Sequence, residues 1–151
     1  AGMFGVVGLA GVSAAPIVGR LSDRRSPRVT AAIGICVMIA SFLLLYAGRT
    51  SIAAVVVAVI LLDIGVQSAL ISNQARMYAI SAEAAGRLNT VFMTSYFLGG
   101  AFGSAVAGLA WTHIGWGGVC GVALVLLASA FAPYARKPPA RRSRVTHDAP
   151  E

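Results

Sequence analysis

Residues 19–28 read Gly-Arg-Leu-Ser-Asp-Arg-Arg-Ser-Pro-Arg, and this stretch decides the fold. It places four arginines and one aspartate within ten residues. The runs on either side, residues 1–18 and 29–48, contain no Asp, Glu, Lys, Arg or His. In a helix that rises about 1.5 Å per residue, about 20 apolar residues cross a hydrocarbon core of about 30 Å. The pattern therefore predicts two membrane-spanning helices joined by a short charged loop at the membrane surface.

The composition is typical of a membrane protein. Of the 151 residues, 58% are hydrophobic and 11% are charged, whereas an ordinary soluble domain carries about 25% charged residues. A net charge of +7 would suit a nucleic-acid partner, but the arginines form clusters separated by apolar spans. We therefore expect a lipid bilayer as the partner of this chain and no nucleic acid.

Five stretches are long and apolar enough to span a membrane as helices. They are residues 2–19, 27–48, 51–74, 89–111 and 118–134. The sequence thus predicts an all-α, polytopic transmembrane helix bundle over residues 1–135, followed by a basic, disordered tail over residues 136–151. The chain opens without a basic segment or a cleavage site, so we interpret residues 2–19 as a span of a longer protein and not as a signal peptide.

The positions of Lys and Arg predict the orientation of the bundle. Five alternating spans put the arginines of residues 19–28, Arg76, Arg87 and the Lys and Arg residues of the tail on one face. Only Arg49 lies on the other face. Because positively charged loops tend to stay in the cytoplasm, we expect the first face and the C-terminus to be cytoplasmic.

Small residues recur at every fourth position in the first and fourth spans. Such spacing leaves a ridge flat enough for another helix to approach closely. We expect helix packing at Gly11, Ala15, Gly99, Gly100, Gly103 and Gly108. Tyr96 lies one turn before Gly100 on the same face, and we expect it to serve packing as well.

The third span carries a polar stripe that begins at Asp63, near the middle of the bilayer. At about 100° per residue, Gln67 and Gln74 lie within about 40° of Asp63, and Asn73 lies within about 80°. A charge at this depth costs about 2.5 to 3.5 kcal/mol, so it marks either a substrate or proton pathway or a hydrogen bond between helices. Ser68 and Ser72 point away from this stripe and are expected to pack or to bond to their own helix.

The sequence offers no constellation typical of an enzyme. It contains no nucleophile and base pair, no Gly-rich phosphate loop and no paired carboxylates. Cys36 and Cys120 lie in apolar runs, and His113 and His147 stand alone, so neither pair suits a metal ion. We predict a protein that is not an enzyme and binds no cofactor or metal.

The charged stretch resembles a known signature. Residues 19–28 are similar to the G-x-L-x-D-R-x-G-R-R motif of the major facilitator superfamily of secondary transporters, although Ser26 and Pro27 replace the usual Gly-Arg. Asp63, residues 73–76, residues 87–90 and Gly99-Gly100 also look like the tenth and eleventh spans of bacterial efflux-type members. The resemblance maps the chain onto spans eight to twelve, in the C-terminal half. Spans two to six would give the same topology, but the arginine and Gly-Pro motifs of first halves are missing.

The resemblance implies a gating role for the charged loop. In the family, the motif aspartate and arginines hold the cytoplasmic ends of helices together in one state of alternating access. Carried over to this sequence, the gating residues would be Gly19, Arg20, Asp23, Arg24 and Arg28. The alternative is a basic loop that only fixes the orientation of the spans.

Together these features indicate part of a secondary active transporter that moves a small organic solute by alternating access, with proton-coupled efflux as the leading hypothesis. The resemblance places it as a multi-pass protein in a bacterial inner (plasma) membrane, with an N-terminal half that this chain lacks. The alternative is a small, non-transporting membrane protein that acts as an assembly partner or anchor. An upstream reading frame that encodes about seven more spans would separate the two, because such transporters are built from two related halves.

Overall fold

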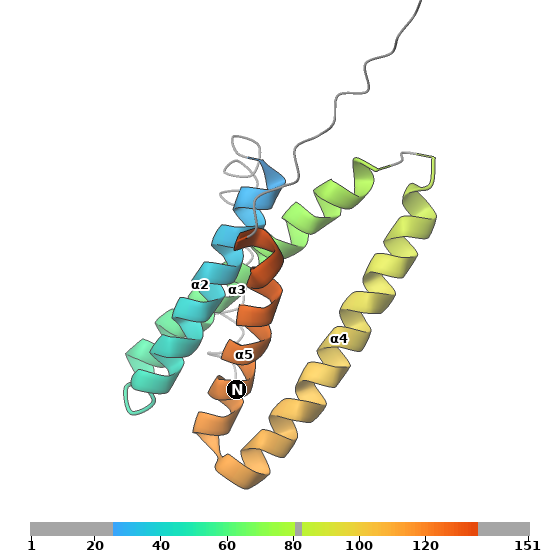
Figure 1. The fold of residues 1–151 in the computed structure, drawn as a ribbon. Helices are drawn as coiled ribbons and strands as arrows, with labels where there is room; N and C mark the ends of the chain where they lie inside the picture. The colour runs from blue at the N-terminus through green and yellow to red at the C-terminus, as the bar shows by residue number, and fades with distance from the viewer. Residues whose placement is uncertain (1–25, 81–82, 136–151) are drawn as a thin grey trace, which may run out of the picture.

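The computed structural model describes residues 26–80 and 83–135 of the chain, and this part consists of four long helices (Figure 1). They are α2 (Pro27–Ala47), α3 (Ile52–Tyr78), α4 (Ala85–Ile114) and α5 (Trp116–Ala135). All four are long and apolar enough to cross a membrane. The prediction of an all-α membrane bundle is therefore confirmed, with four spans in the described part. The expected span 2–19 and the expected tail 136–151 lie outside the described residues.

The helices begin and end at residues with identifiable local signals. Pro27 opens α2, where its missing N–H costs nothing. At the other end, the Gly48 N–H donates to the Leu44 carbonyl at 2.7 Å. Ser51 then caps α3, because its side chain accepts a bond from the Ala54 N–H at 3.4 Å. A loop of four residues thus reverses the chain between two antiparallel spans.

Two connections are shorter than the sequence predicts. The polar segment 76–88 was expected to be a loop, but α3 continues to Tyr78 and α4 starts at Ala85. No proline interrupts this segment, and polar residues at a membrane surface can stay helical, so the change in polarity marks the membrane edge and not the helix end. The expected turn between residues 111 and 118 consists of Gly115 alone, whose φ of 73° and ψ of −149° suit only glycine.

Close packing of α2 on α3 forms the tightest pair in the described part. A Cβ added at Gly34 would lie 2.8 Å from the Gly65 carbonyl oxygen, and one added at Gly65 would lie 2.8 Å from that of Gly34. About two turns from this crossing, the buried Ser41 hydroxyl donates to the Ala58 carbonyl at 2.6 Å. Small side chains let the two backbones approach, so packing and a hydrogen bond hold the pair together.

The helix α5 lies against α2 and is attached near both of its ends. Near the α4–α5 turn, the Trp116 indole N–H donates to the Leu45 carbonyl at 3.1 Å, beside a buried cluster of Leu45, Ala58 and Cys120. At the opposite end, Arg28 donates from Nη2 to the Pro133 carbonyl at 2.8 Å. Both acceptors belong to the last turn of a helix, where carbonyls lack partners within the helix.

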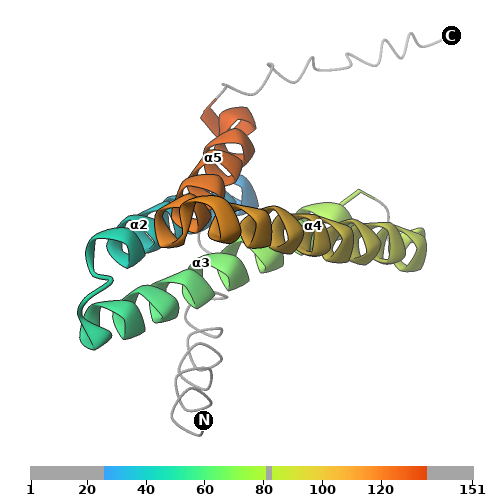
Figure 2. The ribbon, with the colours of Figure 1, turned by 90° about the horizontal axis from the view of Figure 1, so that it is seen from below.

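The helix α4 meets α5 at the tight turn at Gly115, and from there towards its own start it runs apart from α2 and α5 and ends beside the end of α3 (Figure 1). Seen from below, it crosses the molecule while α5 points away from it (Figure 2). Much of its apolar surface is exposed, with Phe97 at 68% and Phe102 at 64% exposure. Within the described residues nothing covers this surface, which suits contact with lipid or with further helices.

Candidate functional site

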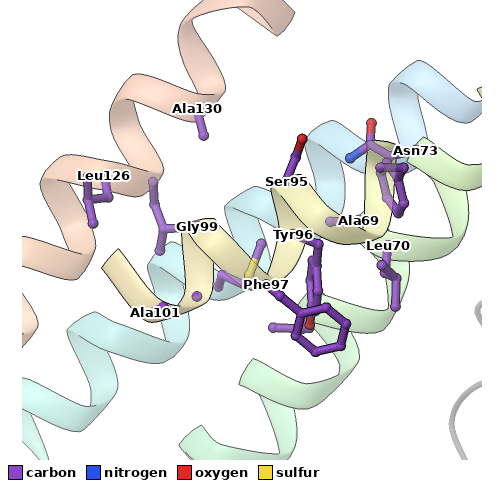
Figure 3. A pocket seen from close by; sticks show the side chains of 15 residues that line it. Ala69, Leu70, Asn73, Ser95, Tyr96, Phe97, Gly99, Ala101, Leu126 and Ala130 are labelled. Carbon is purple, nitrogen blue, oxygen red and sulfur yellow. The ribbon is translucent and has the colours of Figure 1, made fainter. Parts of the chain in front are cut away.

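A cavity of about 800 Å³ lies between the diverging α4 and the other three helices (Figure 3). The third helix lines it with Val66, Ala69, Leu70 and Asn73. The fourth helix contributes Phe92, Ser95, Tyr96, Phe97 and residues 99–101. Met38 of α2 and residues 126, 127 and 130 of α5 complete the lining. The size is within the range of about 300 to 1,000 Å³ that is common for small-molecule sites.

Most of the lining is apolar, and aromatic rings gather on the α4 side. The rings of Tyr96 and Phe97 meet edge to face, with their centroids 5.6 Å apart and their planes at 77°. The hydroxyl of Ser95 donates to the Val91 carbonyl of its own helix at 2.8 Å. Asn73 is the remaining polar residue of the lining besides Tyr96. The cavity therefore has an apolar interior with one amide, that of Asn73, on the α3 side.

Asn73 belongs to a polar cluster that joins the end of α3 to the end of α5. Its Oδ1 accepts a bond from the Tyr134 hydroxyl at 3.1 Å and a longer one from Arg76 Nη1 at 3.4 Å. The same Nη1 donates to the Tyr134 oxygen at 3.2 Å. The Arg76 guanidinium also lies 5.7 Å from the centre of the Tyr134 ring, in reach of a cation–π interaction. We call Asn73, Arg76 and Tyr134 the polar cluster.

The polar stripe expected on α3 is divided by the structure. Asn73 lines the cavity, whereas Asp63, Gln67 and Gln74 do not. The buried residues that face α2, among them Gly65 and Ser72, lie about 140° or more around the helix from Asp63. Asp63 therefore points away from α2, and it lies about 20° around the helix from the cavity residue Leu70. Asp63, Gln67 and Gln74 are half-buried, at the flank of the cavity.

The two serines next to the stripe behave as expected. Ser68 donates to the carbonyl of Ile64 in its own helix at 2.7 Å. Ser72 is fully buried against α2, and its hydroxyl has no hydrogen-bond partner in the described part of the chain. Both serines serve packing and local bonding, as their position away from Asp63 predicts.

The helix contacts expected at the glycines of the fourth span do not form within the described part of the chain, so packing there stays a prediction. Within the described residues, nothing lies within 4 Å of a Cβ added at Gly99, Gly100, Gly103 or Gly108, and the first two line the cavity. The close approaches are instead at Gly34, Gly65 and Gly118, where an added Cβ would meet backbone oxygen within 3 Å. Gly11 and Ala15 lie outside the described residues.

The comparisons with known proteins decide the family. The family model of the Major Facilitator Superfamily matches residues 1–150. The chain belongs to the major facilitator superfamily. Together with four helices apolar enough to cross a membrane, this membership makes it a multi-pass membrane protein. The fold and the family that the sequence suggested are both confirmed.

Relatives of this superfamily chain are named as transporters. It is 40% identical to the "Uncharacterized transporter YgaY" of Escherichia coli O157:H7 over 102 residues, which make up 68% of this chain and 26% of the relative. It is 34% identical to the "Probable transporter SCO4007" of Streptomyces coelicolor over 138 residues, which make up 91% of this chain and 32% of the relative. The chain spans about a quarter to a third of the length of these relatives. No solved structure gives a significant match.

Membership in the superfamily directs attention to the charged loop. Arg28 is the motif residue that the structure describes, and it ties the start of α2 to the end of α5 through the Pro133 carbonyl. Gly19, Arg20, Asp23 and Arg24 lie outside the described residues. Family and relatives point to a transporter and not to an enzyme, and in residues 26–80 and 83–135 no three His, Cys, Asp or Glu side chains gather as a metal site.

Sequence reasoning missed Arg76, Tyr134 and the aromatic side of the cavity in this superfamily member. Arg76 counted as a topology signal and as part of the family resemblance, but not as a site residue. Tyr96 was expected to pack, whereas it is 45% exposed and lines the cavity. The available signal was the hydroxyl of Tyr134 at the end of an aliphatic span, close in sequence to Arg136 and Lys137. The partners of Tyr134 lie about 60 residues away, so only the fold brings them together.

Proposed function

We propose that this chain is part of a secondary active transporter that moves a small organic solute by alternating access, through proton-coupled efflux. The observation that carries the proposal is the cavity of about 800 Å³ between α3, α4 and α5 in a member of a transporter superfamily. The cavity extends from Val66, near mid-membrane, towards the polar cluster. Solute sites of such transporters lie near the bilayer midplane, between helices that move relative to one another.

The proposal includes the position of the chain within a larger protein. We infer that it forms spans eight to twelve, the C-terminal half, and that an N-terminal half completes the transporter. The chain covers 26% and 32% of the relatives that it matches, which supports this inference. We further propose a bacterial inner membrane location with the C-terminus in the cytoplasm, because Arg28, Arg76 and Arg87 lie at one end and Arg49 at the other.

Asp63 is the proposed proton carrier. It is the one acidic residue within the described helices, and it lies within about one turn of Val66 at the deep end of the cavity. A carboxyl at this depth is costly while it is charged, so its protonation can be coupled to a change in exposure to water. Gln67 and Gln74 continue the same face towards the cytoplasmic end and are the proposed lining of the proton pathway.

Gating is proposed for the charged loop, residues Gly19, Arg20, Asp23, Arg24 and Arg28. The bond from Arg28 to the Pro133 carbonyl supports this role, because it joins the ends of two spans at the proposed cytoplasmic side. Separation of these ends would open the cavity towards the cytoplasm. Such a contact can bias an equilibrium between two states only if one of the states lacks it.

A flux experiment tests this proposal. The protein in its full reading frame is placed in liposomes with an acidic lumen, and luminal pH is followed with a trapped dye. Three probes are added outside in turn: naphthalene-2-sulfonate, the naphthalen-2-ylmethyl-trimethylammonium cation, and glucose. We expect at least one ring-bearing probe to speed the loss of luminal protons, and Asp63→Asn to abolish this effect.

Glu83→Gln is the matched control, since Glu83 is the exposed carboxylate of the α3–α4 connection. This variant should retain the wild-type response. Wild-type proton flux in Asp63→Asn would contradict the role of Asp63. If none of the probes moved protons or entered the liposomes, the transporter proposal itself would be overturned.

A further inference from the structure

Asn73 is the member of the polar cluster that lines the cavity, and its amide leaves donors and no spare acceptor for a ligand there. The Oδ1 of Asn73 already accepts bonds from Tyr134 and Arg76, at 3.1 and 3.4 Å. The Tyr134 hydroxyl donates to Asn73 and accepts from Arg76. This arrangement fixes the Asn73 amide so that its NH₂ group is the part left for a ligand, and an NH₂ group can only donate.

Arg76 adds a positive charge that no carboxylate balances in the described part of the chain. Its Nη1 serves Asn73 and Tyr134, which leaves the N–H groups of Nε and Nη2 for other acceptors. The acidic residues of the described ranges are Asp63 and Glu83, and neither forms an ion pair with Arg76 there. Asp63 lies about 20 Å from Arg76 by helical rise. The guanidinium thus remains a cation directly behind a residue of the cavity wall.

The rest of the cavity suits an apolar body that contains a ring. Phe92, Tyr96 and Phe97 of α4 provide aromatic faces and edges on one side of the cavity. On the other sides Leu70 of α3 and Leu126 of α5 provide aliphatic surface (Figure 3). Flat rings bind well to such surfaces, because aromatic edges and faces attract one another beyond the burial of area. A volume of about 800 Å³ accommodates one or two fused rings with a polar substituent.

We propose that the cavity binds an organic anion with a ring-bearing apolar body, and that Arg76 and the Asn73 amide hold its charged group. This inference rests on the proposed transport function and specifies the substrate class of the same cavity. A carboxylate or sulfonate at this end would accept charge-assisted bonds from the guanidinium while the rings lie among Phe92, Tyr96 and Phe97. Arg76 would be the residue that separates anions from other aromatic solutes.

An organic cation is the competing substrate class, and Asp63 would be its counterion. The structure favours the anion, because Arg76 bonds to Asn73 of the cavity lining, whereas Asp63 neither lines the cavity nor bonds to a residue that does in the described part of the chain. The charged groups near the polar cluster are Arg76 itself and, at the same end of the described bundle, Arg28, Arg87 and the exposed Glu83 of the α3–α4 connection. The three arginines outnumber the one carboxylate, so this end of the cavity would repel a cation.

Equilibrium binding of two permanently charged probes tests the proposal. The protein in its full reading frame is placed in nanodiscs of zwitterionic lipid and titrated in a calorimeter with naphthalene-2-sulfonate and with the naphthalen-2-ylmethyl-trimethylammonium cation. Both probes carry the same naphthalene ring system, so a difference in their affinities comes from their oppositely charged groups. We expect the sulfonate to bind at least tenfold more tightly than the cation, and Arg76→Gln to weaken the sulfonate at least tenfold.

Three variants separate the role of charge from a general loss of structure. Arg49→Gln removes an exposed arginine at the other end of the bundle and should change neither affinity. Arg76→Lys keeps the charge and should recover part of the sulfonate affinity. Tyr96→Ala should weaken both probes, because it removes part of the shared ring surface. Equal weakening of the sulfonate by Arg76→Lys and Arg76→Gln would overturn the role of the charge.

The remaining outcomes each have a distinct meaning. If the cation bound as tightly as the sulfonate or more tightly, the anion inference would be wrong, while the transport proposal would stand. If neither probe bound, both would be overturned. An exposed arginine at a membrane surface can also hold a lipid phosphate. If nanodiscs rich in phosphatidylglycerol abolished sulfonate binding, Arg76 would be assigned to the lipid headgroup and the inference would fall.

Discussion

At the scale of single residues, glycine decides where two helices can meet. Gly34 and Gly65 bring the backbones of α2 and α3 together, and the surrounding positions are small or flexible, namely Met38, Ser68 and Ala69. In a membrane, lipid tails are as apolar as the helix surfaces, so association depends on close packing rather than on the exclusion of water. A side chain at either glycine acts directly on that packing.

Gly65→Val should therefore lower stability. Its Cβ alone would lie 2.8 Å from the Gly34 carbonyl oxygen and 2.6 Å from the flexible Met38 Cγ, and the added methyl groups enlarge the clash. We expect a loss of about 1 to 3 kcal/mol, seen as a lower midpoint of thermal unfolding in detergent. Gly121→Ala is the control, because nothing lies within 4 Å of its added Cβ. An unchanged midpoint for Gly65→Val would contradict the close contact of α2 and α3.

Ser41 contributes a smaller, directional part of the same contact. Ser41→Ala removes the bond of 2.6 Å to the Ala58 carbonyl, and we expect a loss of about 0.5 to 1.5 kcal/mol by the same thermal assay. Ser129→Ala serves for comparison, since its exposed hydroxyl bonds to the Leu126 carbonyl of its own helix. If Ser129→Ala lowered the thermal stability as much as Ser41→Ala does, the bond between the helices would contribute no more than a bond within one helix.

At the scale of the helix, α5 is held to α2 near both ends while α4 is free along much of its length. Trp116 and Arg28 donate to carbonyls in the last turns of α2 and α5. The Gly115 turn joins α4 to α5 at one end, and the bond from the Tyr78 hydroxyl to the Asn89 Oδ1 holds the other end of α4 beside the end of α3. This arrangement leaves the cavity between α4 and its neighbours.

Trp116→Phe should loosen the attachment of α5. It removes the indole N–H bond of 3.1 Å to the Leu45 carbonyl but keeps an aromatic ring beside Trp111. We expect a loss of about 1 kcal/mol in thermal stability. Trp111→Phe is the matched control, because Trp111 is 55% exposed, and it should cost less. Equal losses for the two variants would contradict a stabilising role of the Trp116 bond.

At the scale of the whole molecule, charge is separated between the two ends of the bundle. The end of α3 and the start of α4 lie together, since the Tyr78 hydroxyl donates to the Asn89 oxygen at 3.2 Å. The start of α2 and the end of α5 share that end through Arg28. The described arginines other than Arg49 therefore gather at one membrane surface, which sets a definite expectation for orientation.

Labelling of single cysteines on intact cells measures that orientation. In a background without Cys36 and Cys120, Thr50→Cys at the α2–α3 turn should react with a membrane-impermeant maleimide. Ala79→Cys, at the end of α3, should react only after the membrane is permeabilised. The reversed pattern would place the arginine-rich end outside and would remove the proposed cytoplasmic side of the transporter.

The sequence by itself determined the class of the protein, the four described spans to within about four residues at each end, and its family. Those features are local: apolar length sets the spans, Pro27, Ser51 and Gly115 set their limits, and residues 19–28 carry the motif. Tertiary structure decided which small residues pack, that Asn73 and not Asp63 lines the cavity, and that Arg76 meets Tyr134. Such pairings depend on how each helix is rotated and on which helix it packs against, and long-range packing sets both. The apolar composition of these spans is similar on every side, so it does not specify them.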